Sequence, residues 1–313
     1  MKSNTDNEQS VFIRVACDPS TGQAFFARLS TRLPWPDAVA LCGGLSYPAA
    51  MLTAYLARLG HSAATPPTLA TVTALHRAHV EAIPFENLDV LVGRRPSLTL
   101  DDIVTKLVHG RRGGYCFEQN SLFRAVLEQL GVPVTLLMAR VRFGTQSIRP
   151  RTHTLLRIEV EGRSYIADVG FGGWGLSVPL RLDAGVERHD GLLSHRLMKT
   201  GDLWVLQARL DEEWADLYAF TLEPYHAVDL EMANHYVATH PDSQFRRRLV
   251  AQRTRADRRL MLRDGALATR TATGTDCRQL DGVDAVVNVL LVEFGITAPA
   301  GLADALVEGG VIT

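Results

Sequence analysis

Apolar residues in the first part of the chain recur at the spacing of a single helix face. Several such stretches lie between residues 47 and 132, and glycines or prolines interrupt them. An apolar residue at every third or fourth position is typical of an amphipathic helix with one buried side. The stretches are residues 51–59, 69–83, 99–108 and 116–130. We therefore predict a small domain of four to five helices over residues 47–132.

Beyond Pro133 the pattern changes to alternation with a period of two and to short apolar runs. Runs of this length separated by short turns are typical of an antiparallel sheet or barrel. The predicted strands are residues 134–143, 153–160, 164–169, 203–210 and 214–220. A last amphipathic helix is expected over residues 283–294, with Val286, Val287, Leu290 and Leu291 facing inward. We expect a barrel domain over residues 133–232 and a further domain over 233–313.

Residues 1–46 form an N-terminal extension with two open interpretations. The first ten residues are polar, and residues 11–15 and 23–29 can form short strands around a Pro19–Gly22 turn. The segment is either an accessory hairpin or mostly disordered, and we favour disorder. It lacks a long apolar core behind a basic start, so we do not expect a signal peptide.

Composition narrows the classes of partner. The chain has 313 residues, 46% hydrophobic and 21% charged, with a formal net charge of −1. This balance gives no electrostatic reason to expect nucleic acid or a membrane as partner. The cysteines Cys17, Cys42, Cys116 and Cys277 are scattered, without the spacing of a zinc site or a disulfide framework. We expect no metal and a cytoplasmic location.

Cys116 is the candidate nucleophile. It follows Gly113 and Gly114 and precedes an amphipathic run, so it is expected in the first turn of a helix. The helix dipole and the free N–H groups at that end favour a thiolate. The alternative is an inert, buried cysteine, since free cysteine is among the most buried residue types.

Two residues downstream favour the reactive interpretation. His153 opens one predicted strand and Asp168 closes the next, with Gly162 at the turn between them. If the strands pair as a hairpin, a base and its orienting carboxylate lie on adjacent strands, as an activated thiol requires.

Three motifs resemble the arylamine N-acetyltransferase family. They are RGGYCFEQN at residues 112–120, IPFENL at 83–88 and ADVGFGG at 167–173. Their order and spacing match that family's pattern, and Cys116, His153 and Asp168 then correspond to its catalytic triad. The resemblance covers the chain from about Tyr47 onward and leaves residues 1–46 outside.

The resemblance implies a fold and a reaction. The fold is an α+β one, with an N-terminal helical domain, an antiparallel β-barrel and an α/β lid around a core like that of papain and transglutaminases. The reaction is ping-pong transfer of an acetyl group from acetyl-CoA, through Cys116, to a small aromatic amine or hydrazine. Phe85 and Phe220 are expected in the acceptor pocket, although Phe85 can equally be a core residue. The glycine-rich loop is expected to contact CoA through Gly170, Phe171, Gly172 and Gly173. His240 is a further CoA candidate, with capping of the following turn as the alternative.

Arg112 is expected to form a structural ion pair behind the nucleophile. Its guanidinium suits Glu86 or Asp89, two carboxylates without a local cation. Two other groups of charged or polar residues receive ordinary interpretations. His76 and His79 are expected to be core or surface histidines rather than metal ligands, and the arginine-rich run between Arg246 and Arg263 a solvated face.

Three alternatives to the acetyltransferase remain open. An amide synthase of the same fold would close a macrolactam without CoA, and a cysteine hydrolase or transglutaminase would use the same residues on peptides. A non-enzymatic binding protein is expected to lack a triad member, and all three members are present. A homodimer is compatible with the sequence.

Overall fold

The computed structural model describes residues 11–17, 24–29, 49–61, 66–145 and 147–312. The chain divides into two units, Met1–Ser46 and Tyr47–Thr313. In the first unit β1 (Val11–Cys17) pairs antiparallel with β2 (Ala24–Leu29). This pairing corresponds to the hairpin given as one of the two interpretations of residues 1–46. The disorder expected for the rest of this segment concerns positions outside the described residues.

The second unit begins with the helical domain, whose helices follow the predicted apolar stretches. Thr68 caps α2 by accepting a hydrogen bond from the Thr71 N–H at 3.2 Å, and Gly131, with a φ of 81°, follows the end of α5. The single helix expected over residues 99–108 is an α-helix that continues as a π-helix. The helices are α1 (Ala49–Leu59), α2 (Leu69–Ala82), α3 (Leu88–Leu91), α4 (Leu100–Ile103), the π-helix η1 (Val104–His109) and α5 (Cys116–Gln129).

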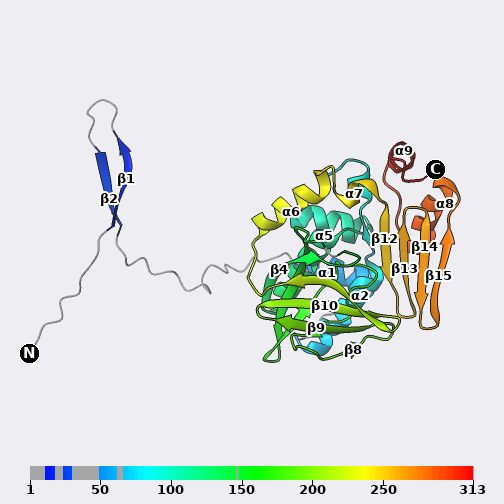
Figure 1. The fold of residues 1–313 in the computed structure, drawn as a ribbon, viewed down its shortest axis with the longest axis horizontal. Helices are drawn as coiled ribbons and strands as arrows, with labels where there is room; N and C mark the ends of the chain where they lie inside the picture. The colour runs from blue at the N-terminus through cyan, green and yellow to red at the C-terminus, as the bar shows by residue number, and fades with distance from the viewer. Residues whose placement is uncertain (1–10, 18–23, 30–48, 62–65, 146, 313) are drawn as a thin grey trace, which may run out of the picture. The chain divides into compact units, whose positions relative to one another are not determined.

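An eight-stranded antiparallel sheet follows and curls into a nearly closed barrel (Figure 1). Its strands are β4 (Val134–Val141), β5 (Arg151–Val160), β6 (Arg163–Ala167), β7 (Leu180–Arg181), β8 (Arg188–His189), β9 (Ser194–Thr200), β10 (Leu203–Leu210) and β11 (Glu213–Phe220). Their order is β7-β6-β5-β4-β11-β10-β9-β8. The pairing of β4 with β5 shifts register at Thr152, since Ala139 pairs with His153 but Arg140 with Arg151. A bulge of this kind re-aims the side chains beside it.

The third part of this unit combines helices with a five-stranded sheet. Its strand order is β15-β14-β13-β12-β3, and β3 (Phe85–Glu86) comes from the helical domain. The remaining elements are α6 (Ala227–Thr239), α7 (Gln244–Arg247), β12 (Val250–Thr254), β13 (Arg258–Arg263), β14 (Ala266–Thr271), β15 (Gly274–Gln279), α8 (Gly282–Val289), the π-helix η2 (Leu290–Phe294) and α9 (Leu302–Glu308). Glu86 pairs with Ala251 and Phe85 with Gln252, so the lid sheet includes one strand from a much earlier part of the chain.

The last predicted helix needs one correction. Val286 and Leu290 are buried as expected, but Leu291 is 56% exposed. The helix changes from α to π at Leu290. A π turn takes more residues than an α turn, so the apolar face no longer includes the next position.

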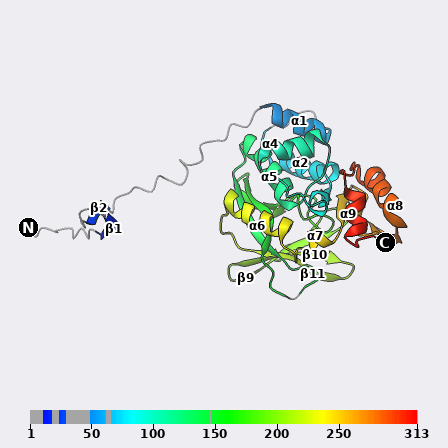
Figure 2. The same cartoon turned by 90° about the horizontal axis from the view of Figure 1, so that it is seen from above.

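The second unit places its three parts around α5. In Figure 2 the helices α1, α2 and α4 lie on one side, β10 and β11 on the opposite side, and α8 and α9 on a third flank. Separate apolar clusters fill the helical part, the barrel and the lid. The predicted α+β fold class is confirmed, whereas the exact domain boundaries stay predictions. Among the described residues, no helix is long and apolar enough to cross a membrane.

Candidate active site

Cys116 is the first residue of α5 and only 4% exposed. The glycines before it are required by close packing. A Cβ atom on Gly113 would lie 2.2 Å from the Pro84 carbonyl oxygen, and one on Gly114 would lie 2.7 Å from Glu118 Oε2. The same Glu118 oxygen accepts the Tyr115 N–H at 3.0 Å, which satisfies a donor at the helix start. The chain before the nucleophile is therefore held tightly against its neighbours.

His153 joins Cys116 to Asp168. Its Nε2 donates to Asp168 Oδ2 at 2.7 Å, which leaves Nδ1 for the Cys116 thiol, with which the ring also interacts. Burial acts to lower the pKa of His153, but the Asp168 carboxylate and Cys116 outweigh it and raise the pKa to about 10. The imidazole therefore carries its proton at neutral pH and stabilises a negative sulfur beside it.

Asp168 is ionised although it is buried. Burial favours the neutral acid, but His153, Asn120 and the Gly170 N–H stabilise the carboxylate and hold its pKa below the usual range. Asn120 Nδ2 donates to Asp168 Oδ1 at 3.0 Å and to the Thr154 carbonyl at 2.7 Å. Its Oδ1 accepts the Val169 N–H at 3.1 Å. Asn120 lies one helical turn beyond Cys116, so α5 carries both the nucleophile and the support of the carboxylate.

Two further side chains enclose the triad. The Asp168 N–H donates to His76 Nε2 at 3.1 Å, and burial lowers the pKa of His76 to about 4, so this ring is neutral. Tyr218 places its ring 4.7 Å from that of His153. Burial, together with the nearby Asp168 carboxylate, raises the pKa of Tyr218 well above its ordinary value. Both rings are fully buried.

Asn120 and Tyr218 were not predicted from the sequence, and His76 was expected only as a core or surface histidine. Asn120 had one usable signal, because it is a polar residue of the RGGYCFEQN motif four positions after Cys116, on the same face of the predicted helix. Tyr218 had none, since only the pairing of β11 with β4 brings it beside His153.

Arg112 lies between both of its expected partners. Its Nη2 is 2.7 Å from Glu86 Oε1 and 3.3 Å from Asp89 Oδ1. A second cation, Lys106, contacts Asp89 at 2.6 Å and Glu118 at 2.7 Å. Two cations and three carboxylates thus form one connected network under the start of α5. Sequence reasoning did not place Lys106 or Glu118 in it.

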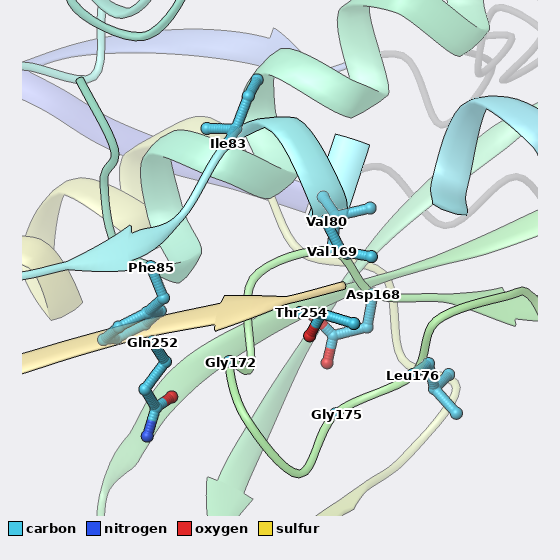
Figure 3. Close-up of a pocket in the computed structure, with 10 residues that line it drawn as sticks. All are labelled: Val80, Ile83, Phe85, Asp168, Val169, Gly172, Gly175, Leu176, Gln252 and Thr254. Carbon is cyan, nitrogen blue, oxygen red and sulfur yellow. The ribbon is translucent and has the colours of Figure 1, made fainter. Parts of the chain in front are cut away.

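The glycine-rich loop after Asp168 is packed closely against the triad and the lid. A Cβ atom on Gly170 would lie 2.7 Å from Cys116 Cα, and one on Gly172 would lie 1.8 Å from Gln252 Oε1. Figure 3 shows the loop passing from Asp168 through Gly172 and Gly175 beside Gln252. The Gly170 N–H already donates to Asp168 Oδ1 at 2.9 Å, and the Gly173 N–H to Gln252 Oε1 at 2.8 Å. Close packing alone therefore explains these glycines, and contact with CoA stays a prediction.

The two predicted residues of the acceptor pocket occupy separate environments. Phe85 is 7% exposed and lines a cavity of about 10 Å³ with Asp168, Gln252 and Thr254 (Figure 3). That volume holds about one water molecule. Phe220 is 1% exposed and packs in the barrel core.

His240, the remaining CoA candidate, follows the end of α6. Its Nδ1 accepts the Asp242 N–H at 3.1 Å, which is the capping contact given as its alternative. Its ring also stacks on Tyr236 at 4.4 Å.

A larger cavity of about 940 Å³ lies at the end of β4. It is lined by Arg140, Val141, Arg142, Phe143, Gly144, Thr145, Ser147, Ile148, Arg149, Trp214, Ala215 and Asp216. The cavity is connected to the triad through β11. Val141 in its lining pairs with Tyr218, and the Tyr218 ring contacts His153. The lining contains three arginines and one carboxylate, Asp216, and this excess of positive charge suits an anionic ligand with an aromatic part.

Comparison with known proteins decides the family. A family model described as N-acetyltransferase matches residues 68–302. An arylamine N-acetyltransferase from Mycolicibacterium smegmatis is 39% identical over 251 residues, which are 78% of this chain and 91% of that protein. The chain belongs to the arylamine N-acetyltransferase family. The resemblance seen in the three motifs and the enzyme class inferred from them are thereby confirmed.

Other members of the arylamine N-acetyltransferase family agree. A Salmonella typhimurium protein named arylamine N-acetyltransferase / N-hydroxyarylamine O-acetyltransferase is 39% identical over 248 residues, 78% of this chain and 88% of that one. The Mycobacterium marinum arylamine N-acetyltransferase in complex with CoA has a TM-score of 0.76 and 39% identity, covering 81% of this chain and 94% of that one. Among the described residues, no group of three or more His, Cys, Asp or Glu side chains is arranged to hold a metal ion.

Proposed function

We propose that this protein transfers an acetyl group from acetyl-CoA to an arylamine, arylhydrazine or arylhydroxylamine, through an acetyl-cysteine at Cys116. The observation that carries the proposal is the contact chain from Cys116 through His153 to Asp168. Membership of the family supports the reaction, and the CoA complex of the Mycobacterium marinum relative supports the donor.

In the first half-reaction the Cys116 sulfur attacks the thioester carbonyl of acetyl-CoA. The negative charge that develops on the oxygen needs a donor, and the N–H of Cys116 at the first turn of α5 is the proposed one. The His153 imidazolium then gives its proton to the leaving sulfur of CoA.

In the second half-reaction the amine attacks the acetyl-cysteine carbonyl. His153, now neutral, takes the proton that the amine loses, and the Cys116 sulfur leaves. Asp168 keeps the ring in one orientation throughout, because its second oxygen is fixed by Asn120 and the Gly170 N–H.

For the phosphates of CoA, the basic cavity at the end of β4 offers the most suitable chemistry. Arg140, Arg142 and Arg149 supply guanidinium groups, and Phe143 and Trp214 supply aromatic faces. The other predicted contacts also stay candidates: for CoA these are Gly170, Phe171, Gly172, Gly173 and His240, and for the acceptor Phe85 and Phe220. The absence of a metal requirement, the cytoplasmic location and the homodimer also stay predictions.

Mass spectrometry of the intact protein after brief exposure to acetyl-CoA without an amine tests the proposal. We expect one added acetyl group, located on Cys116 by peptide mapping, and its removal when an arylamine is added. Cys116→Ser is the matched control and should gain none. Acetyl on Cys17, Cys42 or Cys277 instead, or no acetyl on the wild type, would contradict the proposal.

A further inference from the structure

Arg259 is a buried arginine within the arginine-rich run between Arg246 and Arg263, which we expected to be a solvated face. For this residue the expectation is wrong, since it is only 1% exposed. A guanidinium removed from water must be paired and hydrogen-bonded. Its Nη1 donates to the carbonyl oxygens of Gly173 at 2.8 Å and Gly175 at 2.7 Å. Its Nη2 donates to Ser177 Oγ at 2.8 Å and to Asp190 Oδ2 at 2.7 Å.

The side chains of His195 and Gln252 also form hydrogen bonds with backbone groups of the same loop. His195 Nε2 donates to the Trp174 carbonyl at 2.9 Å. Burial, with Arg259 nearby, lowers the pKa of His195 to about 4, so the ring is neutral and donates from one nitrogen. Gln252 accepts the Gly173 N–H from the lid strand β12. The carbonyls of three successive residues, Gly173, Trp174 and Gly175, are thus fixed by side chains from the lid and from β9.

Two aromatic side chains, Phe171 and Trp174, belong to the chain between Asp168 and Gly175. The Phe171 ring lies 5.1 Å from the His153 ring and 5.2 Å from the Tyr218 ring. The Trp174 ring lies 6.4 Å from Phe143, which lines the cavity of about 940 Å³. The position of the loop therefore sets two aromatic groups, one against the catalytic imidazole and one beside the cavity.

The triad is held by contacts that do not involve Arg259. Asp168 is fixed by His153, Asn120, the Gly170 N–H and the bond from its own N–H to His76. All of these contacts lie before Gly173 in the loop. Phe171 also lies before Gly173, whereas Trp174 lies between the two glycines whose carbonyls Arg259 holds. Loss of Arg259 should therefore displace the Trp174 ring and leave the thiol chemistry intact.

We infer that Arg259 is a positioning residue through which the lid fixes the Gly173–Ser177 loop, and that this loop determines how fast aromatic acceptors react. The inference rests on the proposed acetyl transfer through Cys116. It assigns a role in acceptor selectivity to a residue on β13 that does not contact the triad.

The test compares two acceptors in the second half-reaction alone. Acetyl-enzyme is prepared with acetyl-CoA, freed of CoA, and mixed with phenylhydrazine or with hydrazine, which lacks the ring. The variant is Arg259→Met combined with Asp190→Asn, so that no buried carboxylate loses its cation. Arg263→Met, an exposed arginine on the same strand, is the matched control. The pH profile of Cys116 alkylation by iodoacetamide is recorded for each protein.

We expect the rate with phenylhydrazine to fall at least about tenfold in the double variant, because a displacement of about 1 Å can cost that much or more. The hydrazine rate and the alkylation profile should stay at the wild-type values, as should every rate of Arg263→Met. An equal loss with both acceptors, a shifted alkylation profile, or no loss with phenylhydrazine would each overturn the inference.

A second variant and a second measurement cover failure of the double variant to fold. Arg259→Lys keeps a cation for Asp190 but cannot span the loop carbonyls, and it should show the same selective loss. Hydrogen exchange on the wild type should show slow exchange at Gly173 and Gly175, whose N–H groups are paired. Rapid exchange there would contradict the fixed loop, and this readout does not depend on acetyl transfer. A wild type that forms no acetyl-cysteine would instead refute the proposed function.

Discussion

At the scale of single residues, the charge on His153 results from two opposing effects. Burial alone would make this ring neutral, as it does for His76, whose pKa falls to about 4. At His153 the Asp168 carboxylate at 2.7 Å and the Cys116 sulfur reverse that effect and raise the pKa to about 10. Two buried histidines within the same core thus have opposite charge states, because only one of them has its ring nitrogens facing anionic groups.

Asp168→Asn should remove the imidazolium at neutral pH. The amide is neutral, so burial then dominates and the ring loses its proton. At neutral pH iodoacetamide should alkylate Cys116 of the wild type faster than Cys116 of the variant, because the variant lacks the imidazolium that stabilises a negative sulfur. Because the pKa of His153 is raised, its charged form is present at low pH and is lost as the pH rises through about 10.

The exposed Cys277 provides an internal reference in the same experiment, since it should react alike in both proteins. An unchanged Cys116 profile in Asp168→Asn would show that the carboxylate does not maintain the charge of His153.

At the scale of elements, the start of α5 rests on the network of Arg112, Lys106 and their three carboxylates. Glu86 has no exposed side-chain surface, and Arg112 only 15%. Burial raises the pKa of Glu118 to about 7, although Lys106 acts to lower it. These groups connect β3, α3, η1 and α5, so the helix that carries the nucleophile is fixed by charges as well as by apolar packing.

Removing Arg112 should destabilise the fold. In Arg112→Gln the buried Glu86 loses its cation, at a cost of about 3–5 kcal/mol in the free energy of unfolding. We expect the lower end, since Lys106 still neutralises Asp89. A loss of about 3 kcal/mol corresponds to a fall in melting temperature of roughly 6 °C or more. Thermal denaturation followed by circular dichroism measures it.

Arg124→Gln is the matched control, because it removes an arginine from a surface i,i+4 pair on α5 itself. It should cost no more than about 0.5 kcal/mol. Arg112→Lys should recover only part of the loss, since lysine cannot make the bidentate contact. A wild-type melting temperature in Arg112→Gln would show that the network does not hold α5.

The sequence predicted most elements because their cause is local. The apolar periodicity of α2 and α5 and the alternation in β5 and β10 are properties of consecutive residues. The pairing of β3 with β12 could not be predicted in this way, because a strand of two residues is too short to show an apolar pattern. Arg112 and Arg259 differ in degree: the partners of Arg112 lie 26 and 23 positions earlier, within the same predicted domain. Those of Arg259 lie 69 to 86 positions earlier and depend on how the lid meets the barrel.

At the scale of the whole molecule, several buried ionisable groups change their protonation state on unfolding. Burial is the first cause of the lowered pKa values of His76, His79 and His195, which are about 4, 3 and 4. His79 stays satisfied while neutral, because it bonds Tyr55 at 2.8 Å and Gln119 at 3.0 Å. Each of these histidines takes up a proton when the chain unfolds below its ordinary pKa of about 6.5.

The protein should therefore lose stability as the pH falls from 6 to 5. The three histidines stay neutral in the folded state over this range and become charged on unfolding. Glu118, with a pKa of about 7, releases a proton on unfolding and offsets one of them, while His153 is protonated in both states. Unfolding thus takes up about two protons, and the free energy of unfolding should fall by about 2–3 kcal/mol per pH unit. Urea denaturation at pH 7, 6 and 5 measures this slope, and His79→Gln should reduce it by about 1.4 kcal/mol per unit. Equal stability at pH 6 and pH 5 would mean that these histidines can be protonated within the folded protein, and that their burial does not exclude the charge.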